Sequence, residues 1–162
     1  MPKQISEAQF EEHIQNALIA QHGYTKRGAS NYDKKFGLDR ELLAQFIQNT
    51  QPDVWNALVE QHSEDFVQHA FSKRLTQQLE TFGILHVLRH GIKDQGVSVD
   101  LFYARPESDL NPEIAELFSN NIFSVMRQCK YSERNENSLD LVVFINGIPL
   151  ITMELKTALT WQ

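Results

Sequence analysis

The sequence has few of the residues that mark secreted, membrane or cysteine-metal proteins. It contains a single cysteine, Cys129, among 162 residues, so an internal disulfide and a cysteine-rich zinc site are both excluded. It has no apolar run of about 18 residues, which a membrane-spanning helix needs. Its first residues, MPKQISEAQF, lack the apolar core of a signal peptide. These absences predict a cytoplasmic protein with no membrane partner.

Positive charge is also scarce. The formal net charge is −6 at pH 7, whereas a stand-alone nucleic-acid binder usually carries a basic surface. Any affinity for DNA is therefore expected to come largely from other parts of an assembly. The phosphate-binding pattern GxxxxGK[ST] is missing, so we do not expect ATP to bind here. The length suffices for one domain with a real core.

The first half of the chain has the signals of helices. Ser6 and Gln9 have the spacing of a capping box, and Gly23 is placed to end the helix that they open. The polar residues 25–37 are predicted to form a loop. Further helix starts are predicted at Asp39, Pro52, Ser63 and Asn111. The helix from Ser63 is expected to be the longer one and to end at Gly83.

The second half changes to the periodicity of strands. Residues 97–101 alternate between apolar and polar, and residues 123–126 form a further apolar run. Residues 139–145 and 148–155 are apolar on both faces, which is typical of central strands covered by helices on both sides. The pattern predicts an α/β (α+β) fold with a central mixed β-sheet flanked by helices and a helical N-terminal half.

Three charged residues interrupt these apolar runs. Asp140 begins the first run, and Glu154 and Lys156 end the second. Charged side chains on such strands are costly unless they are paired or ligated. Two acids that share a divalent cation, with an ammonium group beside them, suit metal-dependent cleavage of phosphodiesters. The competing interpretation is that the three are solvated strand ends, with Glu154 and Lys156 forming an ion pair.

The turn between the runs decides whether these side chains can meet. Side chains alternate between the two faces of a strand. With a two-residue turn at Asn146-Gly147, Asp140 faces away from Glu154 and Lys156. A three-residue loop with Gly147 as a left-handed bulge puts all three on one face. A metal site therefore requires this bulged loop, or another bulge that restores the parity.

These same residues carry a family resemblance. Residues 137–150, NSLDLVVFINGIPL, with MELK at residues 153–156, resemble the N-terminal endonuclease domain of the restriction (R) subunit of type I restriction-modification enzymes. That domain belongs to the PD-(D/E)xK nuclease superfamily. The likeness extends to Phe10-Glu11 and Gly23-Tyr24, and to residues 50–55 and 91–96. It implies a restriction-endonuclease-like core.

The resemblance also implies a set of metal ligands. Asp140 and Glu154 would bind Mg²⁺, with the carbonyl of Leu155 as a further ligand. Glu11 on the first helix matches a family carboxylate near the metal, although its neighbour Glu12 is an alternative. Hard oxygen ligands and retained waters suit this ion.

Catalysis would then rest on Asp140, Glu154 and Lys156. Lys156 would position or help to deprotonate the attacking water and stabilise charge on the scissile phosphate. Two departures from the family pattern stand out. Leu139 occupies the place of the proline in the superfamily name, and the glutamine- and tyrosine-bearing helix that follows the lysine is not reached, so Gln162 cannot be assigned to it.

The resemblance implies partners as well. We expect residues 1–162 to form a single domain of a longer bacterial or archaeal chain, whose motor domains bind ATP and translocate DNA. Double-stranded DNA and the modification (M) and specificity (S) subunits would be the partners. Arg127, Lys130 and Arg134 are candidates for contacts with the DNA backbone. The alternative function is a non-catalytic DNA-docking or subunit-assembly module.

Overall fold

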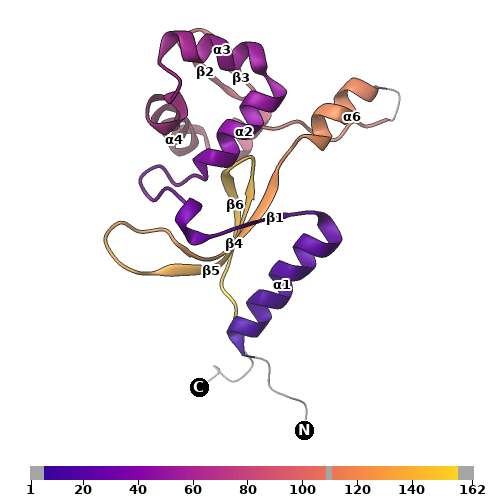
Figure 1. Ribbon diagram of the computed structural model, residues 1–162, viewed down its shortest axis with the longest axis vertical. Coiled ribbons are helices and arrows are strands. Elements are labelled where there is room, and N and C mark those ends of the chain that lie inside the picture. Colours follow the sequence, from indigo (N-terminus) through magenta and orange to yellow (C-terminus); the bar gives the residue numbers. More distant parts are fainter. Residues whose placement is uncertain (1–5, 109–110, 157–162) are drawn as a thin grey trace.

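The computed structural model describes residues 6–108 and 111–156 (Figure 1). A mixed β-sheet lies at its centre, with one helix alongside the sheet and a helical cluster beyond one end of it. The predicted mixed α/β class is therefore confirmed. Within the described residues no helix has the length and apolar character needed to cross a bilayer.

Local capping signals set most of the helix starts. Helix α1 (Glu7–His22) begins with the predicted capping box of Ser6 and Gln9, and ends at Gly23, whose φ of 69° is left-handed. Helix α2 (Arg40–Thr50) is capped by Asp39, which accepts from the backbone N–H of Leu42. Pro52 opens α3 (Pro52–Gln61), and Asn111 caps α6 (Pro112–Ser119).

The predicted long helix from Ser63 is wrong at its start, although it ends at Gly83 as predicted. The structure has a 3-10 turn, η2 (Phe66–Gln68), followed by α4 (Ala70–Phe82) and α5 (Ile84–His90). Phe66, Val67 and Phe71 are all buried around this break, and the rings of Phe66 and Phe71 lie edge to face, 5.9 Å apart. Tertiary packing of these side chains therefore outweighs the helical periodicity of the segment.

The main sheet has the strand order β1-β4-β5-β6. Its strands are β1 (Thr25–Arg27), β4 (Phe123–Lys130), β5 (Ser138–Ile145) and β6 (Ile148–Met153). β1 lies within the segment predicted to be a loop and pairs in parallel with β4, whereas the other pairs are antiparallel. A separate hairpin joins β2 (Ile92–Asp94) and β3 (Val97–Val99).

The two faces of the main sheet are covered differently. Helix α1 packs against β4 and β5, and Arg127 of β4 contacts it. The neighbouring Met126 packs instead with Phe144 and with Tyr32, from the segment after β1. Because successive strand residues face opposite ways, α1 and the Tyr32 segment cover opposite faces.

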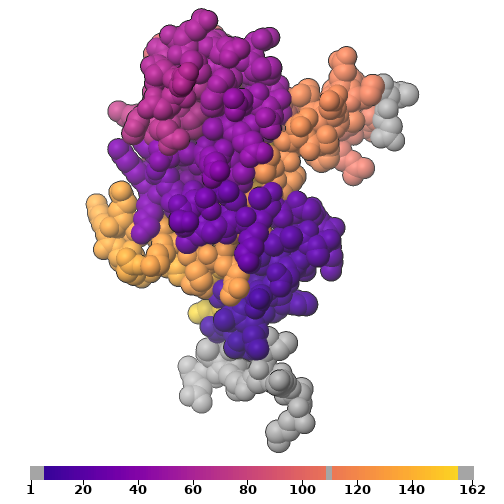
Figure 2. All heavy atoms as spheres, in the orientation of Figure 1, coloured from indigo at the N-terminus to yellow at the C-terminus, as the bar shows by residue number. Residues whose placement is uncertain are grey.

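Most of the apolar core lies beyond the hairpin end of the sheet. It joins α2, α3, α4 and α5 to the β2-β3 hairpin and to Ile145 and Ile148 of the main sheet. Helix α6 stands outside this core as an arm (Figure 2), and it has no buried residue. The helical half therefore anchors one end of the β5-β6 hairpin and leaves the other end, with the charged residues, beside α1.

The prediction that β6 is covered on both faces is wrong. Among the strands that the structure describes, β6 lies at the edge of the sheet. Leu150 and Ile151 are 36% and 48% exposed, respectively, although they are apolar. The apolar run therefore indicated a strand correctly but gave a false picture of its burial.

The turn between β5 and β6 is buried rather than solvated. Asn146 and Gly147 have φ values of 50° and 80°, as a two-residue hairpin turn with the handedness of the strands requires. The Asn146 side chain is fully buried, accepts from the N–H of Ile122 at 2.7 Å and donates to the carbonyl of Leu101 at 2.9 Å. The carbonyl of Gly147 accepts from the N–H of Asp39 at 2.9 Å. The turn thus docks the hairpin onto the start of α2.

Candidate metal and catalytic site

The register of β5 and β6 changes along the hairpin. At the turn Ile145 pairs with Ile148, so the loop has two residues, and the three-residue loop, the first of the two conditions for a metal site, is not formed. Further along, a β-bulge at Leu150 shifts the pairing by one residue, and Leu141 pairs with Met153. The alternative condition, another bulge that restores the parity, is therefore met.

The bulge determines what faces Asp140. The pairing of Leu141 with Met153, extended by one residue, places Glu154 opposite Asp140. Directly opposed residues of an antiparallel pair share one face, with Cβ atoms about 5 Å apart. Asp140 is half-buried, and its Oδ2 accepts from the backbone N–H of Leu155 at 2.6 Å. The two predicted acids are thus neighbours at the open end of the hairpin.

Glu11 brings a third carboxylate to this end of the sheet. It is 4% exposed, in the second turn of α1, whereas Glu12 is exposed, so the structure places Glu11 rather than Glu12 beside the strands. Glu11 Oε2 accepts from Arg127 Nε at 3.3 Å, and Glu11 Oε1 accepts from Gln128 Nε2 at 2.9 Å. The same Gln128 nitrogen lies 3.5 Å from Asp140 Oδ1, so one amide links α1 to the predicted acid of β5.

Glu154 and Lys156 are both exposed. Neither makes a hydrogen bond or an ion pair with any residue that the structure describes. The closed Glu154–Lys156 pair of the competing interpretation is therefore not seen. Leu155 between them is half-buried, and its N–H is engaged by Asp140.

The three predicted DNA contacts differ in their surroundings. Arg127 is 29% exposed at its side chain and donates to Glu11 and to the carbonyl of Ala8, so it anchors α1. Lys130 forms an exposed ion pair with Glu136, and the hydrogen bond from Lys130 lowers the pKa of the Glu136 carboxyl. Arg134 is exposed in the loop between β4 and β5. Of the three, Arg134 keeps its guanidinium clear of any carboxylate that the structure describes.

The donor set offers oxygen atoms only. Asp140, Glu11 and Glu154 are carboxylates, and carboxylate and carbonyl oxygens suit a hard cation such as Mg²⁺, which also keeps several waters. Across the described ranges, no three His, Cys, Asp or Glu side chains are already gathered closely enough to hold a metal ion. The three carboxylates are thus of the ligand type that Mg²⁺ prefers. Two of them, Glu11 and Asp140, are linked by the side-chain amide of Gln128.

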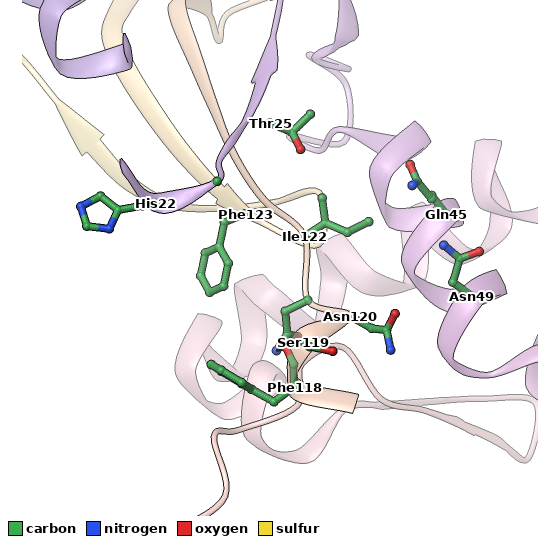
Figure 3. Close-up of a pocket in the computed structure, with 11 residues that line it drawn as sticks. His22, Thr25, Gln45, Asn49, Phe118, Ser119, Asn120, Ile122 and Phe123 are labelled. Carbon is green, nitrogen blue, oxygen red and sulfur yellow. Dashed lines mark hydrogen bonds between the residues drawn. The ribbon is translucent and has the colours of Figure 1, made fainter. Parts of the chain in front are cut away.

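A pocket of about 510 Å³ lies elsewhere (Figure 3). It is lined by residues from the end of α1 and the start of β1, from α2, and from the end of α6 to the start of β4, and Asn120 extends toward the side of α2 that carries Asn49 in the close-up. It contains no carboxylate and no lysine or arginine. Phe123 lies five residues along β4 from Gln128, which separates the pocket from the acids by roughly 17 Å.

Sequence reasoning missed two polar residues of the site. Gln128 lies just beyond the predicted strand of residues 123–126 and was not singled out. Its partner Ser138, whose hydroxyl donates to Gln128 Oε1 at 2.8 Å, entered only as part of the family motif. A polar pair at the ends of two adjoining strands, next to the predicted acid, is the signal that could have found them.

The comparisons with known proteins agree with the motif around these residues. The family model for the type I restriction enzyme R protein N terminus (HSDR_N) matches residues 4–161. No curated protein and no solved structure gives a significant match. The match spans nearly the whole chain and confirms the resemblance that the motif predicted. The chain belongs to the family formed by the N-terminal region of type I restriction enzyme R proteins.

Proposed function

We propose that this chain is a Mg²⁺-dependent endonuclease domain that hydrolyses phosphodiester bonds of double-stranded DNA. The observation that carries the proposal is the Leu150 bulge. It sets Asp140 opposite Glu154 at the exposed end of a hairpin whose other end is buried. β-Bulges are frequent next to active sites because they redirect side chains. A bulge that brings two acids to one face of an edge hairpin is hard to explain by stability alone.

The proposed roles follow from the chemistry of each group. Asp140 and Glu154 would hold the cation, with Glu11 and the carbonyl of Leu155 completing the protein ligands. When bound, Mg²⁺ would polarise the phosphate and lower the pKa of a water molecule. Lys156, an exposed ammonium group two residues beyond Glu154, would stabilise negative charge on the scissile phosphate and orient the attacking water.

The context of the family supports a division of labour. The net charge of −6 gives this chain little general attraction for DNA. We propose that an ATP-driven motor elsewhere in the R subunit and the modification (M) and specificity (S) subunits deliver the DNA. Cutting would then follow translocation. Arg134 is the best-placed of the predicted DNA contacts, because Arg127 and Lys130 are already engaged.

A non-catalytic docking module is the competing function. It predicts a closed ion pair between Glu154 and Lys156, with Asp140 remote. In the structure Glu154 and Lys156 are exposed and do not pair with each other, and the strand register sets Glu154 opposite Asp140. Both observations favour the catalytic function instead.

The test uses Asp140→Asn, Glu154→Gln and Lys156→Ala in the assembled restriction enzyme. We expect DNA cleavage to fall by about 100-fold or more in each, as when a transition-state contact is removed. ATP hydrolysis and complex assembly should be retained. Glu60→Gln, an exposed acid on α3, is the matched control and should cut normally. Normal cleavage by Asp140→Asn would refute the catalytic assignment. Loss of assembly in all three variants would favour the docking module.

A further inference from the structure

Gln128 has an unusual backbone conformation for a residue inside a strand. Its φ is 50°, in the left-handed region that residues with a Cβ atom disfavour. Arg127 and Cys129 on either side keep the regular pairing with β5, so the strand continues through it. The other described non-glycine residues of this kind include Gln95 and Asn146, which lie in hairpin turns. Such an outlier inside a strand suggests a functional constraint.

The left-handed conformation redirects the Gln128 side chain. Successive strand residues normally face opposite ways, yet Arg127 and Gln128 both contact Glu11 of α1. Gln128 Nε2 lies 2.9 Å from Glu11 Oε1 and 3.5 Å from Asp140 Oδ1. The amide therefore reaches the space between two carboxylates that come from different elements.

The orientation of the amide follows from its partners. Ionised carboxylates only accept hydrogen bonds, so the NH₂ group of Gln128 must face Glu11 and Asp140. The hydroxyl of Ser138 donates to the opposite end of the amide, Gln128 Oε1, at 2.8 Å. Ser138 thus holds the amide with its two N–H groups directed at the acids.

We infer that Gln128 is a positioning residue that occupies the place of the cation in the metal-free chain. Its neutral NH₂ group can satisfy one oxygen of each acid, but it cannot neutralise their repulsion, as a divalent cation would. The inference deepens the proposed function and rests on it. With a cation bound, Gln128 would withdraw its nitrogen from the two acids, beginning with the longer contact to Asp140.

Each acid keeps a second anchor when Gln128 withdraws. Glu11 Oε2 is held by Arg127 at 3.3 Å, and Asp140 Oδ2 is held by the N–H of Leu155 at 2.6 Å. The oxygens released are Glu11 Oε1 and Asp140 Oδ1. The carboxylates therefore remain in place while these two oxygens become available to a cation.

The experiment measures Mn²⁺ binding to this chain by the electron paramagnetic resonance signal of free Mn²⁺. Gln128→Gly removes the amide and tolerates the left-handed backbone. Gln128→Met removes the donors and keeps a side chain of similar volume. The 2.9 Å hydrogen bond to Glu11 and the weaker 3.5 Å contact to Asp140 no longer have to be broken. Both variants should therefore bind Mn²⁺ about 3- to 10-fold more tightly than the wild type. Gln95→Gly has the same substitution at a φ of 46° in the β2-β3 turn and should bind like the wild type.

The outcomes separate this inference from the proposed function. Wild-type binding that is lost in Asp140→Asn, with tighter binding in both folded Gln128 variants, supports both. Unchanged or weaker binding in the Gln128 variants, with normal far-ultraviolet circular dichroism, overturns the role of Gln128 and leaves the metal site standing. Absence of Mn²⁺ binding by the wild type overturns the metal site and the role of Gln128 with it.

Discussion

Replacing Gly147 with alanine should destabilise the fold far more than the same change at another left-handed glycine. A Cβ atom built on Gly147 would lie 2.2 Å from the carbonyl oxygen of Asp39 and 2.8 Å from the backbone nitrogen of Leu43. Both are backbone atoms, one of the N-cap residue of α2 and one of the helix itself, so no side chain can move aside to relieve the contact. The hairpin or the helix would have to shift.

The loss of stability expected for Gly147→Ala is the sum of three contributions. Alanine at the φ of 80° found for Gly147 adds strain of about 1 kcal/mol. Overpacking against a rigid neighbour typically costs about 1–3 kcal/mol. The hydrogen bond from the N–H of Asp39 to Gly147 would weaken, at about 1 kcal/mol more. Gly147→Ala should therefore lower the free energy of unfolding by about 3–5 kcal/mol, a large part of the stability of an ordinary domain.

Gly96 supplies the matched control. Its φ is 88°, and a Cβ atom there would meet nothing within 4 Å, so Gly96→Ala should cost only the strain of about 1 kcal/mol. Urea unfolding of both variants, followed by fluorescence and circular dichroism, gives the difference directly, provided that the m-values agree. A difference below about 1 kcal/mol between the two variants would refute the docking of the turn on α2.

Two further predictions concern β4. Arg127→Gln should lower the free energy of unfolding by about 1–3 kcal/mol, because it leaves the buried Glu11 without its guanidinium partner. Lys130→Gln removes an exposed ion pair and should change the free energy of unfolding little. Equal effects of the two variants in urea unfolding would contradict this contrast. Burial raises the pKa of the Cys129 thiol from 9.0 to about 11. The neutral thiol therefore favours folding below pH 9, and this contribution, at most about 3 kcal/mol, is lost as the pH rises toward 11. Cys129→Ala should flatten the stability profile over that range, and an unchanged profile would count against the shift.

The helix boundaries that the sequence predicted correctly are those set by local chemistry. Ser6, Asp39 and Asn111 satisfy the free N–H groups of the first turn, and each needs only the next few residues to do so. The strand β1 was missed because its three residues lie in a polar segment without periodicity. Its pairing with β4 joins residues that are about a hundred positions apart in the chain. The sequence of such a short segment does not indicate a pairing partner that is so distant in the chain.

The same contrast explains why the candidate site was only partly predictable. Asp140 and Glu154 were found because charge is conspicuous on apolar strands. Their shared face depends on a bulge at Leu150, which an apolar run cannot reveal, because no alternation exists for the bulge to interrupt. The bond from Arg127 to Glu11 spans 116 positions of the chain, and that from Gln128 to Glu11 spans 117.

Gln128 also shows why an unfavourable local conformation can be informative. A glutamine in the left-handed region within a strand breaks both the local backbone preference and the alternation of faces. This conformation allows the side chain to contact Glu11, Asp140 and Ser138. If stability alone had shaped this position, a residue that favours the extended conformation would serve better. The strained amide therefore makes sense where one oxygen of each carboxylate needs a hydrogen-bond donor until a cation replaces it.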